Sequence, residues 1–396
     1  MIEINPNKIK KAEIVIGIPS YNEADAISNV VRQVDKGLEK YFSNKSAVII
    51  NSDNNSSDKT KEVFLAVKTK APKIYISTPK GIKGKGNNLK NLFLKIKKLK
   101  AKAGATVDAD LKSISPEWIS CLIGPILKGY DYLTPVYHRH KYDATITNNL
   151  CYPLIYGLLG YNIRQPIGGD MAFSNKMVNY WLKQKWPQSS KNFGIDIFMT
   201  LNAIKSRGRI AQVDLGAKVH KPSAPKLDNM FLEVADTFFW FLSENKNLWN
   251  KKIKIKKPVL VCQVKNKEKY PVLDFDYKKI EKKVFSEFKK NYKALKPFIS
   301  KDICFCLEEM FLKEKSLKID SKLWPEIVYQ FLAVYQKNKK KREEVIKLLR
   351  ALYFGRVVCF AKEVSSKNQE QAEKIIQNQA HHFFKTRDYL FSQDIV

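Results

Sequence analysis

Apolar and polar stretches alternate along the first part of the chain in a way that predicts strands followed by helices. Short apolar runs are typical of buried strands, and longer segments with apolar residues every three or four positions are typical of amphipathic helices. The expected strands are residues 12–19, 46–53, 73–79 and 104–111, and the expected helices are 24–42, 56–70 and 86–100. Repeated strand–helix units predict an α/β fold with a Rossmann-like, mainly parallel sheet.

Polar loops follow all four expected strands. They contain the sequences PSYNE, SDNNSSD, TPKGIKGKG and DADL. The carboxyl ends of parallel strands meet at one edge of a sheet, and open α/β sheets bind their ligands at that edge. We therefore expect the four loops to contribute to one binding site.

The rest of the chain has a different pattern. A region rich in aromatic residues with short Gly and Pro breaks extends to about residue 245, and helical periodicity dominates from about residue 276. The expected organisation is a ligand-binding domain, a basic connector and a mostly helical C-terminal domain, at residues 1–245, 246–275 and 276–396. The apolar faces of the C-terminal helices need packing partners, which predicts a homo-oligomer.

The composition limits the classes of partner. The net charge is +32, from 71 Lys and Arg against 39 Asp and Glu, which would suit nucleic acid, an anionic membrane surface or phosphorylated small molecules. Lysine is spread along the whole chain and no nucleic-acid motif accompanies it, so no nucleic-acid partner is expected. No apolar run reaches the ~18–20 residues of a membrane span. These features predict a soluble, cytoplasmic protein without a transmembrane segment, whose six cysteines are reduced core thiols.

Asp108 and Asp110 form a DxD pair at the end of the fourth expected strand. Alternate residues of an extended chain point to opposite sides, so a turn must bring the two carboxylates to one ion or ligand. Carboxylate oxygens are favoured ligands of Mg²⁺ and Mn²⁺. A pair of surface aspartates without a ligand is the alternative interpretation.

Two other loops carry groups that suit a nucleotide. Asp53 could hydrogen-bond a base or a ribose, whereas Ser56 and Asp58 are expected to cap the following helix. In GIKGKGN, Lys85 and the glycine amides can approach a phosphate together. A flexible basic loop is the alternative.

These motifs, in this order, resemble those of the GT-A fold nucleotide-sugar glycosyltransferases. The later segments DATIT, QPIGGDMAFS, NFGIDI and KVHKP are similar to the mannosylglycerate, glucosylglycerate and glucosyl-3-phosphoglycerate synthase group of retaining enzymes. The resemblance covers nearly the whole chain. It implies a GT-A domain followed by a mostly helical C-terminal domain.

The resemblance also implies a metal site and a donor site. A divalent cation, Mg²⁺ or Mn²⁺, would bridge the donor diphosphate and be held by Asp108, Asp110 and His220. The donor would be a UDP- or GDP-hexose. The residues that match the donor site are Pro19, Tyr21, Glu23, Asp53, Lys85 and Asp108.

For the acceptor, the resemblance implies glycerate or a phosphoglycerate. The matching residues are Arg139, Thr147, Arg164, Ile167 and Gly168. A guanidinium fork suits a carboxylate or a phosphate, and a surface ion pair is the alternative role for Arg164. Asp196 matches an acidic residue near the reacting centre, where we expect it to orient substrate and stabilise charge without becoming a covalent nucleophile. Asp170 is the second candidate for that role.

The expected function is therefore metal-dependent, retaining transfer of glucose or mannose that makes a glycosylglycerate compatible solute or its phosphate. Phe193 stands where one branch of the group has Trp, which leaves the sugar open. The first alternative is an inverting transferase with a lipid-phosphate or polysaccharide acceptor. In that case residues 151–163 would be a lipid-facing helix instead of a core helix. The second is a basic module that binds RNA or anionic surfaces on a decayed scaffold, and the intact Asp108, Asp110 and His220 argue against it.

Overall fold

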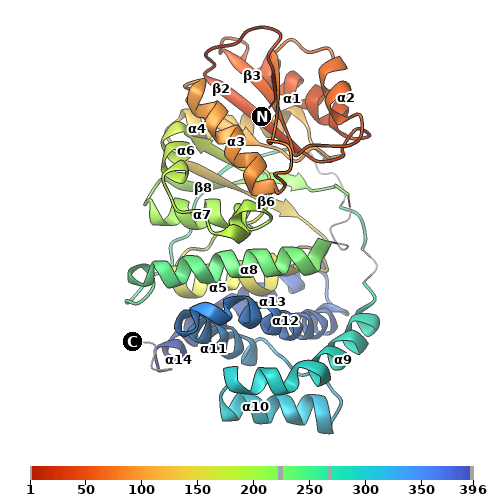
Figure 1. The fold of residues 1–396 in the computed structure, drawn as a ribbon, viewed down its shortest axis with the longest axis vertical. Helices are drawn as coiled ribbons and strands as arrows, with labels where there is room; N and C mark the ends of the chain where they lie inside the picture. Colours follow the sequence, from red (N-terminus) through yellow and green to blue (C-terminus); the bar gives the residue numbers. More distant parts are fainter. Residues whose placement is uncertain (1, 222–225, 266–269, 274, 393–396) are drawn as a thin grey trace. The chain divides into compact units, whose positions relative to one another are not determined.

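The computed structural model describes residues 2–221, 226–265, 270–273 and 275–392 (Figure 1). The chain divides into two compact units, each made of segments that lie far apart in the sequence. Unit 1 consists of Met1–Arg139, Arg164–Pro225 and Pro258–Pro271. Unit 2 consists of His140–Ile163, Lys226–Lys257 and Val272–Val396. This division differs from the expected boundary at residue 245, because residues 140–163 and 226–245 pack with the C-terminal helices.

Unit 1 contains a nine-stranded mixed sheet in the order β1-β4-β3-β2-β5-β7-β6-β8-β9. Its strands are β1 Glu3–Ile4, β2 Ile14–Ser20, β3 Ala47–Asp53, β4 Lys73–Ser77, β5 Ala103–Thr106, β6 Tyr132–His138, β7 Ala172–Ser174, β8 Ile210–Ala217 and β9 Leu260–Gln263. Strands β4, β3, β2 and β5 are mutually parallel, as are β6, β8 and β9. The edge strand β1 and the internal strand β7 run antiparallel to their neighbours. The predicted α/β class with a mainly parallel sheet is confirmed.

Helices cover both faces of this sheet, because successive strand residues point to opposite sides. Ile14 and Ile16 of β2 pack with α1 and α4 in one apolar core, whereas Val15 packs with α3, α6 and α7 in the other. The helices of unit 1 are α1 Ile27–Phe42, α2 Thr60–Ala66, α3 Lys85–Lys98, α4 Pro116–Leu127, α6 Asn175–Leu182, η3 Gln188–Lys191 and α7 Ile195–Lys205.

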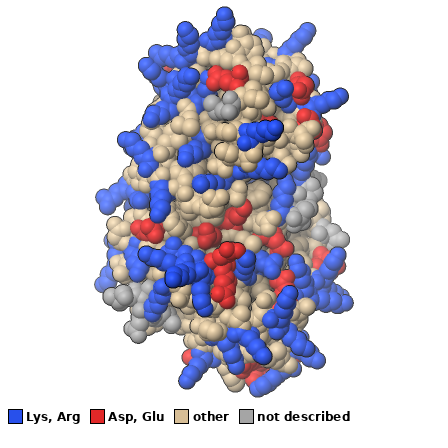
Figure 2. Space-filling model, viewed as in Figure 1, with Lys and Arg blue, Asp and Glu red and all other residues tan. Residues whose placement is uncertain are grey.

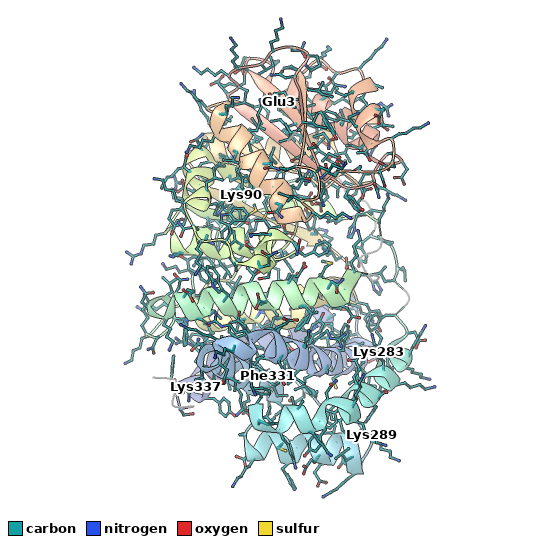
Figure 3. The ribbon with its side chains drawn as sticks, in the orientation of Figure 1. Glu3, Lys90, Lys283, Lys289, Phe331 and Lys337 are labelled. Carbon is teal, nitrogen blue, oxygen red and sulfur yellow. A yellow bond between two sulfur atoms is a disulfide. The ribbon has the colours of Figure 1, made fainter. Side chains whose placement is uncertain are left out.

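Unit 2 is helical. Its helices are η1 Thr147–Cys151, α5 Tyr152–Leu154, η2 Ile155–Leu159, α8 Leu227–Glu244, η5 Lys246–Leu248, α9 Tyr277–Leu295, η6 Lys296–Phe298, α10 Lys301–Glu308, η7 Glu309–Lys313, α11 Leu323–Lys337, η8 Lys339–Lys341, α12 Arg342–Val364, α13 Gln369–Lys385 and α14 Arg387–Phe391. Lysines of α9 such as Lys289 are exposed, whereas Phe331 of α11 is fully buried (Figure 3). The apolar faces predicted for the C-terminal helices therefore find partners inside unit 2. The homo-oligomer stays a prediction.

The apolar segment that follows Asn149 is a core element of unit 2. Tyr152, Leu154, Ile155 and Leu158 are each at most 2% exposed, and α13 packs against this segment. The structure thus supports the core-helix interpretation over the lipid-facing one. Within the described ranges, none of the helices has the length and apolar character needed to cross a bilayer.

The expectation that all six cysteines are reduced is wrong for two of them. Cys121 of α4 and Cys262 of β9 form a disulfide although 141 residues separate them in the sequence. Cys151 and Cys359 are buried free thiols, and burial raises the pKa of Cys359 to about 11. The packing of α4 against β9 brings the bonded pair together, and no local sequence pattern records that packing.

Lysine and arginine side chains are spread over the face of the molecule that Figure 2 draws. Figure 2 shows lysine and arginine side chains scattered over the visible face, without one dominant basic arm. This distribution agrees with the even spread of lysine along the sequence.

Candidate active site

The candidate site lies in unit 1, at the edge of the sheet where the parallel strands end. Strand β5 ends at Thr106, and the chain then turns at Ala109 and Asp110. Ala109 is 3% exposed and packs in the core, while Asp108 and Asp110 stay partly exposed on either side of it. The turn that the DxD spacing required is present, but the two carboxylates meet different partners.

The carboxylate of Asp108 is held between two lysines. Lys218 Nζ lies 2.7 Å from Asp108 Oδ2, and Lys85 Nζ lies 3.5 Å from Asp108 Oδ1. The side chain of Lys218 is only 4% exposed, and it follows directly after β8. Gly169 has a φ of +86°, and a Cβ there would lie 2.5 Å from Asp108 Oδ2, so only glycine lets the chain pass this close to the carboxylate.

Asp170 is the buried support of this arrangement. It is 0% exposed and accepts hydrogen bonds from the Asp108 amide at 2.8 Å, from the Tyr137 hydroxyl and from Lys218 Nζ at 2.6 Å. Burial raises the pKa of Asp170 despite the ammonium beside it. A carboxylate so enclosed cannot touch a substrate, so Asp170 positions the DxD loop and does not fit the second-candidate role expected for it.

Burial and neighbouring charges act in opposite directions on the pKa values of Asp108 and Lys85. Burial disfavours the ionised form of Asp108, but Lys218 and Lys85 outweigh it and hold the pKa of this carboxyl well below its usual range. Burial likewise disfavours the ammonium of Lys85, and the charge of Asp108 outweighs it and raises the pKa of that lysine. Asp108 and both lysines are therefore charged at neutral pH.

Lys85 also connects this cluster to Asp196. Lys85 opens α3 after Gly84, whose φ is +116°, and its Nζ lies 3.2 Å from Asp196 Oδ2 in the first turn of α7. The structure thus brings Asp196 next to Lys85 and Asp108, while its role near the reacting centre stays a prediction. The neighbouring glycine differs from expectation, because the Gly86 amide donates to Asn192 O at 3.2 Å and is thus already used within the protein.

Asp110 lies on the other side of the turn, beside the chain that follows β8. Its Oδ2 accepts a hydrogen bond of 3.1 Å from the Lys221 amide. Glu23, expected at the donor site, pairs with Lys221 Nζ at 2.7 Å. Burial and the charge of Lys218 lower the pKa of His220, while Asp110 and Asp108 act in the opposite sense. His220 is therefore a neutral imidazole near both aspartates, which is the form that ligates metals.

The expected metal triad is not assembled as such. Among the described residues, no group of three or more His, Cys, Asp or Glu side chains could hold a metal ion. Asp108 is occupied by lysines, which leaves Asp110 and His220 as the donors with the right chemistry. One carboxylate and one neutral imidazole suit Mn²⁺ or Mg²⁺ only if other oxygens complete the shell. These two residues fit a cation that arrives with a diphosphate.

The donor loops are organised around Asp53. Its carboxylate is 1% exposed and accepts hydrogen bonds from Ser20 Oγ, the amide and hydroxyl of Ser56, and Tyr75 Oη. With these acceptor positions filled inside the protein, Asp53 supports the loop, and the structure does not expose it to a base. Helix α2 begins at Thr60, four residues later than expected. Ser56 donates to Asp53 and so belongs to the loop before the helix. Asp58 Oδ1 accepts a hydrogen bond of 3.0 Å from the Thr60 amide, where the helix begins.

The other donor candidates differ in exposure. Pro19 is buried near the end of strand β2, whereas Tyr21 is 46% exposed just beyond the strand. An exposed aromatic ring at the edge of a parallel sheet can stack on a base. Tyr21 is thus the donor-loop residue that the structure leaves accessible.

The acceptor candidates fall in both units. In unit 1 the guanidinium of Arg139 lies 4.9 Å from the centre of the Tyr137 ring, and the Arg164 amide donates to Gln212 Oε1 at 2.8 Å. Ile167 is half-buried, and the carbonyl of Gly168 accepts from Lys218 Nζ at 2.8 Å. Thr147 is a buried residue of η1 and belongs to unit 2, whereas the other four acceptor candidates belong to unit 1.

Lys218, Tyr137 and Lys221 are the site residues that sequence reasoning missed. A signal existed for Lys218, because it stands two positions before His220 at a strand end, and alternate strand residues share a side. Tyr137 carried no signal, since an isolated tyrosine in a strand is ordinary.

The sequence matches the model of a known protein family. The family model for the mannosylglycerate synthase glycosyltransferase domain matches residues 6–238. Among curated proteins, none matches the chain. Similar solved structures include glucosyl-3-phosphoglycerate synthase from Mycobacterium tuberculosis with Mn²⁺, UDP and phosphoglyceric acid, at 22% identity over 58% of this chain and 78% of that one, with a TM-score of 0.48. The same enzyme with Mn²⁺ and UDP-glucose matches at 21% identity over 58% and 79%, with a TM-score of 0.47.

Proposed function

Because the chain belongs to the mannosylglycerate synthase glycosyltransferase-domain family, we propose that it moves glucose or mannose from a UDP- or GDP-hexose to glycerate or 3-phosphoglycerate. The product would be a glycosylglycerate or its phosphate, formed with retention at the anomeric carbon. The observation that carries the proposal is the cluster of Lys85, Asp108, Lys218 and Asp196 at the ends of the parallel strands.

Within this cluster, Lys85 is the group that suits a nucleoside diphosphate. Lys85 stands at the start of α3, where the helix N-terminus and the ammonium both favour a phosphate. When the diphosphate binds, Lys85 can turn from Asp108 and Asp196 toward it, which would leave Asp108 Oδ1 free to accept a hydrogen bond from a donor hydroxyl. Tyr21 is placed to stack on the base.

Asp110 and His220 would hold a divalent cation, Mg²⁺ or Mn²⁺, together with the diphosphate. When bound, the cation would act as a Lewis acid that stabilises charge on the leaving diphosphate. The protein contributes the carboxylate of Asp110, which the Lys221 amide orients, and the neutral imidazole of His220.

The acceptor residues are assigned by charge. The guanidinium of Arg139, supported by the Tyr137 ring, would bind the acceptor carboxylate, and Arg164 would bind an acceptor phosphate. The Ile167–Gly168 segment would contact the acceptor hydroxyls. Asp196, next to Lys85, would orient the reacting sugar and stabilise its developing positive charge.

The test is release of nucleoside diphosphate with and without Mn²⁺ or Mg²⁺. UDP-glucose, GDP-glucose and GDP-mannose would be crossed with glycerate and 3-phosphoglycerate, and the anomeric configuration of any product would be read by NMR. We expect release that needs the cation and rises with one acceptor. Slow hydrolysis that no acceptor stimulates would contradict the glycerate assignment, and a product of inverted configuration would contradict retention.

A lipid or polysaccharide acceptor is the competing enzyme function. The lipid-facing helix that it would use lies within residues 151–163, where Tyr152, Leu154, Ile155 and Leu158 are at most 2% exposed in unit 2. No observation in the described part of the chain therefore favours that acceptor.

A further inference from the structure

Lys218 occupies a cage of oxygen atoms. Its Nζ lies 2.7 Å from Asp108 Oδ2, 2.6 Å from Asp170 Oδ2 and 2.8 Å from Gly168 O. The Tyr137 ring closes a further side, with its centre 5.2 Å from Nζ. An ammonium donates three hydrogen bonds, and all three are used here.

Without the ammonium, the cage would be a cation site. Two carboxylates and one backbone carbonyl converging on one point are the hard-oxygen set that binds Mg²⁺, Mn²⁺ or Ca²⁺. Such a site would compete with the one at Asp110, because both aspartates belong to the same short turn. The lysine therefore fills, with a fixed single charge, a position that a divalent cation would otherwise take.

We propose that Lys218 is a positioning residue that keeps the divalent cation away from Asp108, so that the cation binds only together with the donor diphosphate. The inference rests on the proposed function in one respect, namely that Asp110 and His220 hold the catalytic cation. With only these two protein ligands, the cation needs diphosphate oxygens to complete its shell. Asp108 then stays available to the donor, held in place through Oδ2 by Lys218.

The experiment measures Mn²⁺ binding by the electron paramagnetic resonance signal of free Mn²⁺, without acceptor and without turnover. For the wild-type protein we expect UDP or GDP to tighten Mn²⁺ binding by about tenfold or more, equal to ~1.4 kcal/mol. If Mn²⁺ binds as tightly without any nucleotide, the proposal is overturned, and this result requires no variant.

Variants then locate the effect. Lys218→Ala opens the cage, and we expect it to bind Mn²⁺ without nucleotide about tenfold tighter than wild type or better. The double variant Lys218→Ala with Asp170→Asn should lose this gain, because one carboxylate of the cage becomes neutral. Circular dichroism and melting temperature would show that each variant is folded.

Lys85→Ala is the matched control, since it removes the other lysine of Asp108 but leaves the cage filled. We expect it to weaken nucleotide binding without any gain in nucleotide-free Mn²⁺ binding. An equal gain in Lys85→Ala, or none in folded Lys218→Ala, would contradict the proposal. No acceptor is present in these binding measurements. Their results are therefore independent of whether glycerate or 3-phosphoglycerate stimulates nucleoside diphosphate release.

Discussion

Each unit contains a buried cationic side chain that pairs with carboxylates, Arg356 in unit 2 and Lys218 in unit 1. The surroundings of these two side chains differ. In unit 2, Arg356 is 0% exposed and bonds Glu363 Oε1 and Oε2 at 2.5 and 2.9 Å, Gln379 Oε1 at 2.6 Å and Ile319 O at 3.1 Å. In unit 1, Lys218 is nearly as buried, but it shares the carboxylates of Asp108 and Asp170 with other groups.

The balance of charge separates a structural cluster from a functional one. One guanidinium faces one carboxylate in unit 2, and the bidentate geometry is complete within the chain. At the sheet edge of unit 1, Lys85 and Lys218 face three carboxylates, those of Asp108, Asp170 and Asp196. The carboxylates outnumber the lysines, so a cationic ligand can bind to this cluster. Unbalanced clusters of charged residues are typical of active sites.

Asp110→Ala should give the largest functional effect. The carboxylate is needed for the cation and contributes little to packing, so we expect turnover to fall by about 10²-fold or more with little change in melting temperature. Nucleoside diphosphate release at saturating Mn²⁺, beside thermal unfolding, measures both quantities. A variant that keeps near-normal turnover would remove Asp110 from the metal site.

Arg356→Met should lower stability and leave turnover unchanged, the opposite of Asp110→Ala. It leaves Glu363 and Gln379 without their buried partner, at a cost of about 3–5 kcal/mol, while the folded fraction keeps its turnover number. Urea unfolding and single-temperature kinetics would test this. Arg350→Met, on the same helix α12, is the control, because the Arg350 side chain is 20% exposed whereas that of Arg356 is 0% exposed, and the loss of its ion pairs should cost about 1 kcal/mol or less.

The disulfide offers a second structural comparison within unit 1. Cys121→Ser should lower the free energy of unfolding by about 2–4 kcal/mol, since the bond closes a long loop in the unfolded chain. A reductant should destabilise wild type by a similar amount and have no further effect on the variant. Thiol titration of the denatured, unreduced protein should find four free cysteines; six would show that the bond is absent.

Gly169→Ala should give the smallest and most local effect. The positive φ costs about 1–2 kcal/mol, and the new Cβ would press on Asp108 Oδ2, so donor binding should weaken as well. Gly81→Ala is the control, with a similar φ of +84° and no atom within 4 Å of the new Cβ. If both variants bind the donor equally well, the contact of the new Cβ with Asp108 does not affect donor binding.

The α/β class and the turn at the DxD pair could be predicted from local patterns in the sequence. Strand and helix periodicity located β2 to β5 and α1 to α3 within a few residues, because each element satisfies its backbone hydrogen bonds locally or with its nearest strands. The motif order also led to the glycosyltransferase family. The segment Thr147–Leu159 could not be placed in unit 2 on this basis, since its apolar character suits a core in either unit.

What the sequence determined by itself was therefore the strands β2 to β5, the helices α1 to α3 that alternate with them, and the candidate groups Asp108, Asp110, Lys85, Asp196 and His220. Only the tertiary structure decided how those groups pair. Lys218 against Asp108, Asp53 inside its loop and Cys121 against Cys262 each join residues far apart in the chain. Such contacts depend on how helices and strands pack in three dimensions, and local periodicity carries no record of that packing.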